Sequence, residues 1–165
     1  MNFDFSENLF AQVEQMLEEK QIGIIEKNDR KPWGGYFVID EADKATFIKE
    51  FFSEIDIASF GENKISPKIL LVAPEKRLSW QYHHRRAELW KLIGGEAHVA
   101  RSLDDEEQEK QAMITGEIIE LQQGERHRLI GGESWGVIGE IWQHTSTDEP
   151  SDEDDIVRVQ DDFGR

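Results

Sequence analysis

From residue 68 onward the chain consists of short segments that resemble β-strands and are separated by turns. Each segment is rich in aliphatic and aromatic residues, and glycines or acidic runs separate it from the next. Many short strands with such turns are typical of a β-sandwich or barrel, and not of strands alternating with helices around a parallel sheet. The longest segment is interrupted by a glycine pair. The expected strands are residues 68–73, 78–83, 89–100, 112–115, 116–121, 128–130, 135–144 and 156–159.

The N-terminal part of the chain has the spacing of helices instead. In residues 5–20 apolar side chains recur every three or four positions, and Ser6 is placed to cap the N-terminus of a helix. A second helix is expected over residues 40–55, with its phenylalanines packed inward. Between the two helices, a glycine pair after Trp33 predicts a bend and then a short strand. We interpret Trp33 as a core residue rather than as a pocket wall.

These patterns predict a single all-β domain with two helices packed outside it. At 165 residues the chain is long enough to bury a substantial core, and no linker divides it. We therefore expect one domain, residues 1–165, with a helical extension that contains one strand (residues 1–60) and a β-barrel core (residues 65–165).

Charge and composition exclude several classes of partner. The net charge of −16, from 35 acidic and 19 basic residues, argues against nucleic acid or an anionic membrane as partner. Much of the acid lies in residues 104–107 and 148–155, which we expect to be solvated loops. Cysteine is absent, which excludes disulfides and thiolate ligands. We find neither a secretory signal nor a stretch of transmembrane length, so we expect a cytoplasmic protein.

One stretch near the middle of the chain gathers side chains that can bind a metal. In a strand, Gln81 and His83 project to the same face. Glu88 has the opposite parity, but the polar residues before it predict a turn or bulge that resets the phase. His127, after a predicted tight turn, adds a second imidazole. Such a set of nitrogen and oxygen donors suits zinc, nickel, iron or manganese. The alternative is that these are surface polar groups of an acidic protein.

Basic residues cluster beside this candidate metal site. A gathering of arginines in an otherwise acidic protein suits the binding of a small anion. Salt pairing with the surplus carboxylates is the alternative. The residues concerned are Arg85, Arg86, Lys91, Arg126 and Arg128.

Two segments resemble the two motifs of the cupin family of double-stranded β-helix (jelly-roll) proteins. The first cupin motif is a His-x-His pair, three or four residues, a Glu and later a Gly. With Gln in place of the first His, it is matched by Gln81, His83, Glu88 and Gly95. The second motif is a Gly, five residues, Pro-x-Gly, two residues and a His. With Gln in place of Pro, it is matched by Gly116, Gln122, Gly124 and His127.

A longer colinear similarity, over residues 31–165, resembles the type II mannose-6-phosphate isomerase cupins. It is carried by Lys31-Pro-Trp-Gly with Tyr36, by the string from Leu78 to Trp90, by Gly124-Glu-Arg-His-Arg, and by Asp154-Asp-Ile-Val-Arg with Asp162-Phe-Gly-Arg. That cupin is also the carboxy-terminal module of bifunctional enzymes with a mannose-1-phosphate guanylyltransferase domain. The guanylyltransferase part, with its Gly-rich nucleotide loop, is absent here, so we do not expect nucleotide-sugar synthesis by this chain.

The sequence departs from this family pattern at four places. Arg85 stands where a third consecutive His is usual, Glu75 follows Pro74 where Pro-Gly is usual, and His144 stands where a Gly is usual. The loop of residues 145–153 is longer than the family leads us to expect. None of these changes removes an expected metal ligand, but Arg85 and His144 leave the pocket open to a different sugar.

The resemblance implies a metal-dependent aldose–ketose isomerase that acts on a sugar phosphate, such as mannose 6-phosphate or fructose 6-phosphate. It assigns one divalent metal ion to four residues. Zinc is our first expectation, with nickel, manganese or iron as alternatives. The expected ligands are Gln81, His83, Glu88 and His127.

The same resemblance suggests how the substrate is held. For the phosphate group we expect Arg86 and Arg158, with Lys68 as a third cation, because a guanidinium matches the geometry of phosphate. Both arginines are also expected catalytic residues. As catalytic base we favour Glu140, which shares one face of a strand with Trp142 and His144. The alternative is that Glu140 hydrogen-bonds a ligand.

Two further functions stay open at this stage. One is a cupin that binds a sugar or sugar phosphate without turnover, and the other is a different metal-dependent cupin enzyme, such as an iron-dependent oxygenase. The expected partner is a small-molecule sugar phosphate rather than nucleic acid or a membrane. The sequence does not specify the oligomeric state; a homodimer is the assembly we consider.

Overall fold

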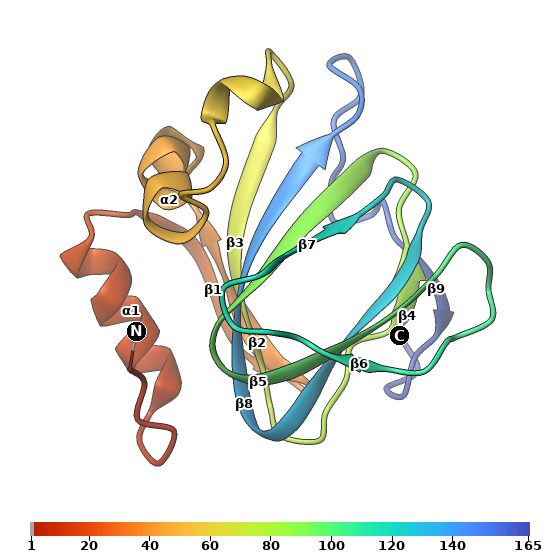
Figure 1. Ribbon diagram of the computed structural model, residues 1–165, viewed down its shortest axis with the longest axis horizontal. Helices are drawn as coiled ribbons and strands as arrows, with labels where there is room; N and C mark the ends of the chain where they lie inside the picture. The colour runs from red at the N-terminus through yellow and green to blue at the C-terminus, as the bar shows by residue number, and fades with distance from the viewer. Residues whose placement is uncertain (1) are drawn as a thin grey trace.

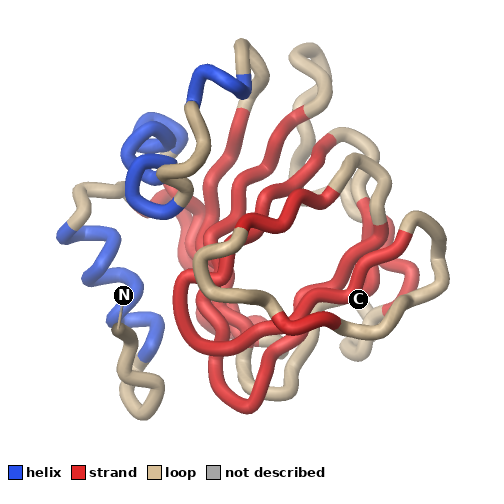
Figure 2. Tube along the Cα trace, viewed as in Figure 1, coloured by secondary structure: helices blue, strands red, loops and turns tan. Residues whose placement is uncertain are grey.

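A computed structural model describes residues 2–165 and shows a protein built mainly of antiparallel strands. The strands curl into a barrel-like body, and both helices lie on one side of it (Figures 1 and 2). The sheet runs in the order β1-β2-β3-β8-β4-β9, while β5 pairs with β6, β7 and β8. The strands are β1 (Ile24–Lys31), β2 (Gly34–Ile39), β3 (Ile65–Val72), β4 (Trp80–Tyr82), β5 (Arg86–Ser102), β6 (Gln111–Ala112), β7 (Ile118–Leu121), β8 (Arg126–His144) and β9 (Val157–Gln160).

The two longest strands, β5 and β8, form the ribbon around which the barrel is built. They pair along almost their whole length, with register shifts on either side of Gly95. Gly95 has φ of +74°, and a Cβ there would lie 1.8 Å from the carbonyl oxygen of Trp135, so only glycine fits. This bulge bends the ribbon, as the predicted interruption of the longest segment suggested.

Gly131 and Gly132 in β8 do not form a turn. Residues 128–130 and 135–144 were predicted as separate strands but belong to one continuous strand. The reason is close backbone approach: a Cβ on Gly131 would lie 2.1 Å from the carbonyl oxygen of Ala73. Glycine at position 131 therefore allows the backbone near Ala73 to pack directly against β8, and it does not mark the end of a strand.

The first helix, α1 (Leu9–Glu19), lies inside the predicted range but has a different cap. Asn8 caps it, because the Asn8 side chain accepts a hydrogen bond of 3.2 Å from the N–H of Ala11. The prediction that Ser6 caps this helix is wrong, because the Ser6 hydroxyl instead donates to Asp4 at 2.6 Å.

The second helix is shorter than predicted. α2 (Lys44–Phe51) follows a 3₁₀ turn (Glu41–Asp43), and a second 3₁₀ turn (Ile57–Phe60) leads into β3. Both helices bury their apolar side chains in one cluster with the outer face of the sheet, as the spacing predicted. The helical members of this cluster are Leu9, Val13, Met16, Leu17, Phe47, Ile48 and Phe51. Neither described helix has the length and apolar character needed to cross a membrane.

The strand β1 was not predicted. Its residues are mostly polar and exposed, because β1 is an edge strand that, within residues 2–165, pairs only with β2. The two strands form a hairpin whose connection contains Trp33. Directly after it, Gly34 has φ of +137°, and a Cβ there would lie 1.9 Å from the carbonyl oxygen of Leu71. This packing presses the hairpin onto β3 and so determines where Trp33 lies.

The inward face of the central strands changes from apolar to polar along its length. The register pairs Leu70 of β3 with Ile138 of β8, and two residues further along it pairs Lys68 with Glu140. Because alternate residues of a strand share one face, these four side chains project to the same side of the sheet. The apolar stretch forms a separate core inside the barrel. The polar stretch beside it forms the candidate site.

Candidate metal centre

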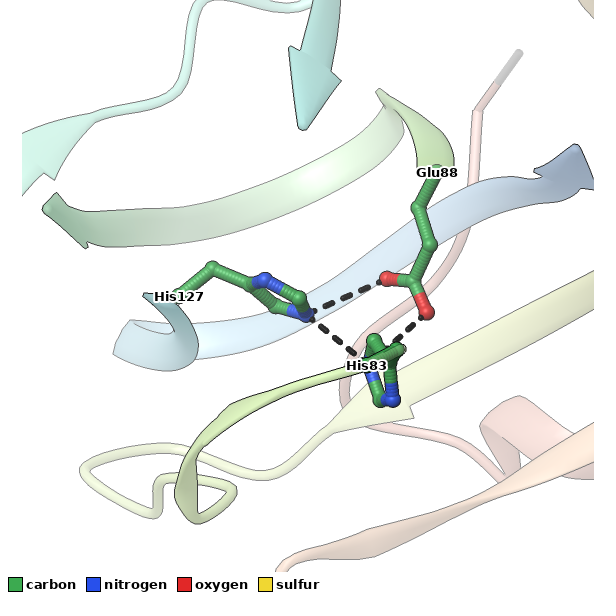
Figure 3. Close-up of side chains that lie close together, drawn as sticks. All are labelled: His83, Glu88 and His127. Carbon is green, nitrogen blue, oxygen red and sulfur yellow. Dashed lines mark hydrogen bonds and ion pairs between the residues drawn. The ribbon is translucent and has the colours of Figure 1, made fainter. Parts of the chain in front are cut away.

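Three buried side chains from different parts of the sheet meet inside the barrel: His83 after β4, Glu88 in β5 and His127 in β8 (Figure 3). One ligand atom from each lies within 4.8 Å of the others. The two Nε2 atoms are 3.3 Å apart, and each lies 3.2–3.3 Å from an oxygen of Glu88. Each side chain is at most 2% exposed. We call these residues the His–His–Glu cluster.

Hydrogen bonds fix both imidazoles in the orientation that a metal ion needs. Nδ1 of His83 lies 2.7 Å from the carbonyl oxygen of Asp155, and Nδ1 of His127 lies 2.9 Å from that of Glu125. A carbonyl oxygen only accepts, so each Nδ1 carries the proton and each neutral ring turns its Nε2 lone pair toward the other. Burial lowers the pKa of His83 despite the opposing charge of Glu88, which favours the neutral ring.

The cluster fits a divalent cation. Two nitrogen lone pairs and a carboxylate that face one another need positive charge between them. Burial alone would raise the pKa of Glu88, but the neighbouring His83, Arg86 and His127 side chains hold it well below its ordinary range. Oε2 of Glu88 is buried and receives no hydrogen bond from any described residue. An unbonded carboxylate oxygen beside two such imidazoles is an arrangement that a metal ion completes.

Gln81, the fourth expected ligand, lies next to the cluster but already has a partner. The register pairs Gln81 of β4 with His127 of β8. Its side chain is buried, and Oε1 accepts a hydrogen bond of 2.6 Å from the hydroxyl of Ser79. The structure thus brings together three of the four expected ligand side chains, and Ser79 orients the amide of the fourth. Gln81 as a ligand stays a prediction.

Asp155 holds the turn that sets the phase between His83 and Glu88. Its carboxylate accepts from the backbone N–H of His84 at 2.9 Å and of Arg85 at 3.0 Å. Burial would raise the pKa of Asp155, but hydrogen bonds from Ser151 and these amides lower it. The sequence predicted the turn but not its support. It placed residues 148–155 in a solvated loop, whereas Ser151 and Asp155 are buried.

Arg86 connects the cluster to the same loop. Its Nε donates to Glu88 at 2.8 Å, and its Nη1 donates to the Ser151 hydroxyl at 2.9 Å. Its Nη2 lies 3.3 Å from Nε2 of His83, and the guanidinium stacks 3.5 Å from the ring centre of Trp142. In this arrangement Arg86 orients Glu88 and holds the loop, and most of its donors are committed to protein groups. Phosphate binding by Arg86 stays a prediction.

A cavity of about 120 Å³ adjoins the cluster and is lined by all the predicted site residues outside the cluster. Glu88 belongs to both the cluster and the cavity wall. The predicted residues that line the cavity are Lys68, Gln81, Arg86, Glu88, Glu140 and Arg158. Residues of the β1–β2 hairpin and of the loop before β9 also line it: Lys31, Trp33, Tyr36, Glu153 and Ile156.

Glu140 is a buried carboxyl group held by two indoles. Trp90 Nε1 donates to one oxygen at 3.0 Å, and Trp142 Nε1 donates to the other at 3.1 Å. Burial and the nearby charge of Glu88 raise the pKa of Glu140 to about 7, although Lys68 and Arg86 oppose them. A carboxyl group that titrates near neutral pH and faces a cavity can both accept and donate a proton there.

The other two residues expected to bind phosphate, Lys68 and Arg158, differ in whether their charge is already paired. Lys68 is buried, and its ammonium lies 2.5 Å from Oε1 of Glu153 and 3.7 Å from the ring centre of Trp142. Arg158, on β9, is exposed and makes no side-chain hydrogen bond or ion pair with residues 2–165. Arg158 therefore presents a free guanidinium to the cavity, whereas Lys68 already has an internal counter-ion.

Sequence reasoning missed the contributions of the hairpin and the loop. Trp33 was interpreted as core; it is buried, but it also lines the cavity. The Lys31-Pro-Trp-Gly string, already part of the family resemblance, was the signal that could have placed the hairpin at the site. For Glu153 the sequence offered no signal, because one acid among many in a loop does not reveal its partner.

Comparison with known proteins agrees with this fold. The family model described as mannose-6-phosphate isomerase C-terminal matches residues 52–161, a region that includes β3 to β9 but not the β1–β2 hairpin. No curated protein matches the chain in sequence.

Solved structures with the same architecture are distant in sequence. Oxalate decarboxylase OxdC of Bacillus subtilis superposes with a TM-score of 0.55 at 12% identity, over 81% of this chain and 30% of that one. The capsular polysaccharide assembling protein CapF of Staphylococcus aureus gives 0.53 at 11% identity, over 82% and 34%. A recombinant oxalate oxidase gives 0.52 at 19% identity, over 80% and 58%. The chain thus spans a third to just over half of these proteins, and the likeness shows the fold alone.

Proposed function

This chain belongs to the mannose-6-phosphate isomerase C-terminal family of cupins, and from that premise we propose that it is a metal-dependent aldose–ketose isomerase. Its substrate is a sugar phosphate such as mannose 6-phosphate or fructose 6-phosphate. One observation carries the proposal: Glu140, a buried carboxyl group held by two indoles, lines the same cavity as Glu88 of the His–His–Glu cluster. Isomerisation of a sugar needs both a polarising cation and a base.

In this proposal His83, Glu88 and His127 hold one divalent ion, with Gln81 as a fourth ligand once its amide oxygen turns from Ser79. Zinc is the first expectation, and nickel, manganese or iron would suit the same donors. When bound, such an ion would polarise a carbonyl or hydroxyl oxygen of the sugar. Arg86 keeps Glu88 oriented toward the two imidazoles, and Asp155 fixes the tautomer of His83.

Glu140 moves the proton. As a carboxylate it takes the proton from the carbon beside the sugar carbonyl, and as the acid it returns that proton to the former carbonyl carbon. The hydroxyl proton on the carbon that Glu140 deprotonates passes to the former carbonyl oxygen, in the same sense, so the reaction needs no other reactant. Trp90 and Trp142 hold the carboxyl group in one orientation through the transfer.

Arg158 is the first choice for the phosphate, because its guanidinium faces the cavity without a protein partner among the described residues. A net charge of −16 repels an anion at long range, so binding depends on such local cations. We also propose a cytoplasmic protein whose partner is this small molecule, without nucleic acid or membrane partners. A homodimer is the assembly to test by light scattering.

The experiment is a sugar-phosphate panel with the chain loaded in turn with zinc, nickel, manganese and iron. Interconversion of mannose 6-phosphate and fructose 6-phosphate is followed by a coupled assay. Incorporation of deuterium from heavy water into the sugar reports proton transfer directly. Turnover with deuterium incorporation supports the isomerase. Binding without either supports a non-catalytic sugar-phosphate cupin, and oxygen consumption with the iron form supports an oxygenase; either result rejects the isomerase.

A further inference from the structure

The cavity is too small for the ligand that the proposed function requires. At about 120 Å³ it lies well below the roughly 300–1,000 Å³ of ordinary small-molecule sites. One of its lining side chains is movable: Glu153 belongs to the loop between β8 and β9, and its side chain is 71% exposed. Its carboxylate nevertheless reaches the ammonium of Lys68 at 2.5 Å.

The two partners of this ion pair differ in their exposure to solvent. The side chain of Lys68 is 7% exposed and lies over the Trp142 ring, so its charge has almost no access to water. An unpaired ammonium in such a place is costly, whereas the carboxylate of Glu153 is readily hydrated. Lys68 therefore needs an anion beside it, but that anion need not be Glu153. A negatively charged group of a ligand can take its place.

The β1–β2 hairpin brings two more donors to the same cavity. Lys31 makes no ion pair with any residue in 2–165, and its ammonium lies 5.8 Å from the ring centre of Tyr36. On the same ring the ammonium of Lys68 lies 5.6 Å from the centre. Glu153 is near enough to help raise the pKa of Tyr36, after burial and the contact with Glu26. The two ammonium groups and the Glu153 carboxylate thus gather around one tyrosine.

Trp33 supplies the neutral donor. Its side chain is 5% exposed and lines the cavity, and its Nε1–H is buried without a hydrogen-bond partner among the described residues. Buried indole N–H groups nearly always have an acceptor, because leaving one unpaired costs free energy. In contrast, the indoles of Trp90 and Trp142 in the same cavity both donate to Glu140. The unused donor of Trp33 points to an oxygen of a ligand.

We propose that Lys31, Trp33 and Lys68 form a subsite for the phosphate group of the ligand, and that the carboxylate of Glu153 occupies this subsite until phosphate displaces it. The identity of the ligand rests on the proposed function; the subsite and its internal occupant rest on the contacts above. Phosphate is the suited anion because it carries more charge than a carboxylate, and its oxygens can accept from these donors and from Arg158, which lines the same cavity. Displacing Glu153 also enlarges the cavity. The hairpin, which lies outside the matched region of the family, would then help to select the ligand.

The test removes the internal anion and the unused donor separately. Calorimetric titrations of the metal-loaded full chain use inorganic phosphate, mannose 6-phosphate and mannose. Glu153→Gln should raise the affinity for both phosphate ligands about 3- to 10-fold and leave mannose unchanged. The matched control is Asp154→Asn, an exposed neighbour with the same change of charge, which should change affinity less than about twofold.

Trp33→Phe keeps most of the ring volume and removes only the N–H. It should lower the affinity for mannose 6-phosphate about 3- to 10-fold, as expected for one lost hydrogen bond. Its control is Trp135→Phe, because Trp135 packs against Phe10 outside the cavity. Thermal melting checks that both variants fold. If Trp33→Phe does not fold, Glu153→Gln alone decides.

The outcomes separate this inference from the proposed function. If Glu153→Gln behaves like Asp154→Asn, or if Trp33→Phe binds like Trp135→Phe, the subsite is wrong even where the chain is an active isomerase. If neither the wild type nor Glu153→Gln binds either phosphate ligand, the subsite is also wrong. If phosphate affinities change as expected but no sugar phosphate is turned over, the subsite stands and the isomerase proposal fails.

Discussion

The His–His–Glu cluster and the rim of the cavity are built on opposite principles. In the cluster, each polar side chain is buried and fixed by a neighbour: Asp155 and Glu125 hold the imidazoles, and Arg86 holds Glu88. At the rim, Arg158 and Lys31 have no ion pair among the described residues. A preorganised centre suits a metal ion, which needs fixed geometry, whereas a rim with free donors suits a ligand that enters and leaves. The predictions below test this contrast.

The largest effect is expected inside the cluster. His127→Ala removes one of two imidazole ligands, and metal affinity should fall by at least about 100-fold, with activity lost as a consequence. Metal content after dialysis against a chelator measures it. His84→Ala, an exposed imidazole beside the cluster, should retain full metal occupancy. Equal occupancy in the two variants would remove His127 from the ligand set.

Glu140→Gln separates chemistry from binding. The amide keeps the shape and the acceptor for an indole but cannot take a proton, so turnover should fall about 10²- to 10⁴-fold. Metal content and affinity for mannose 6-phosphate should change little. Glu120→Gln, on the exposed face of β7, serves as the control. Undiminished turnover in Glu140→Gln would assign Glu140 to ligand binding and leave the base unidentified.

Arg158→Lys tests whether the rim contributes hydrogen bonds as well as charge. The lysine keeps the charge but loses the two-pronged fork, and affinity for mannose 6-phosphate should fall roughly 5- to 150-fold. Metal content should stay unchanged, because Arg158 does not contact the cluster. Calorimetric titration of the wild type and of Arg158→Lys, with mannose as the unphosphorylated control, measures the difference in affinity. Unchanged affinity would remove Arg158 from the phosphate site.

The smallest effect is expected on stability, at His144. Burial lowers the pKa of His144, and its Nδ1 accepts the N–H of Ser151 at 2.8 Å, which a protonated ring cannot do. Nearby charges from Lys64, Glu41, Arg86 and Arg85 act on the same ring. The unfolded state therefore binds more protons, and the free energy of unfolding should decrease as pH falls below about 6.5.

His144→Asn keeps an acceptor for the Ser151 amide but does not titrate. Urea unfolding of both proteins between pH 7.5 and 5.5 should show a smaller loss of stability in His144→Asn than in the wild type. The difference between the proteins isolates His144, since Glu140 titrates in both. Parallel pH profiles would contradict the neutral, buried imidazole.

Local pattern was enough to predict most of the fold. Most strands from β3 onward, both helices and the glycine interruption within β5 follow from side-chain spacing, which reflects which face of an element is buried. The edge strand β1 was missed because most of its side chains face solvent, so its sequence carries no apolar alternation. Its pairing with β2, and not its composition, makes it a strand.

The sequence by itself also determined the identity of the candidate ligands, because two imidazoles, a carboxylate and an amide at that spacing suit a metal. Only the tertiary structure decided what surrounds them. Asp155 hydrogen-bonds the amide of a residue 71 positions earlier, and Glu153 pairs with a lysine 85 positions earlier. In a chain with 35 acidic residues, nothing local distinguishes these two acids from the others. Their roles arise from long-range packing, which buries one carboxylate and places the other against a buried ammonium.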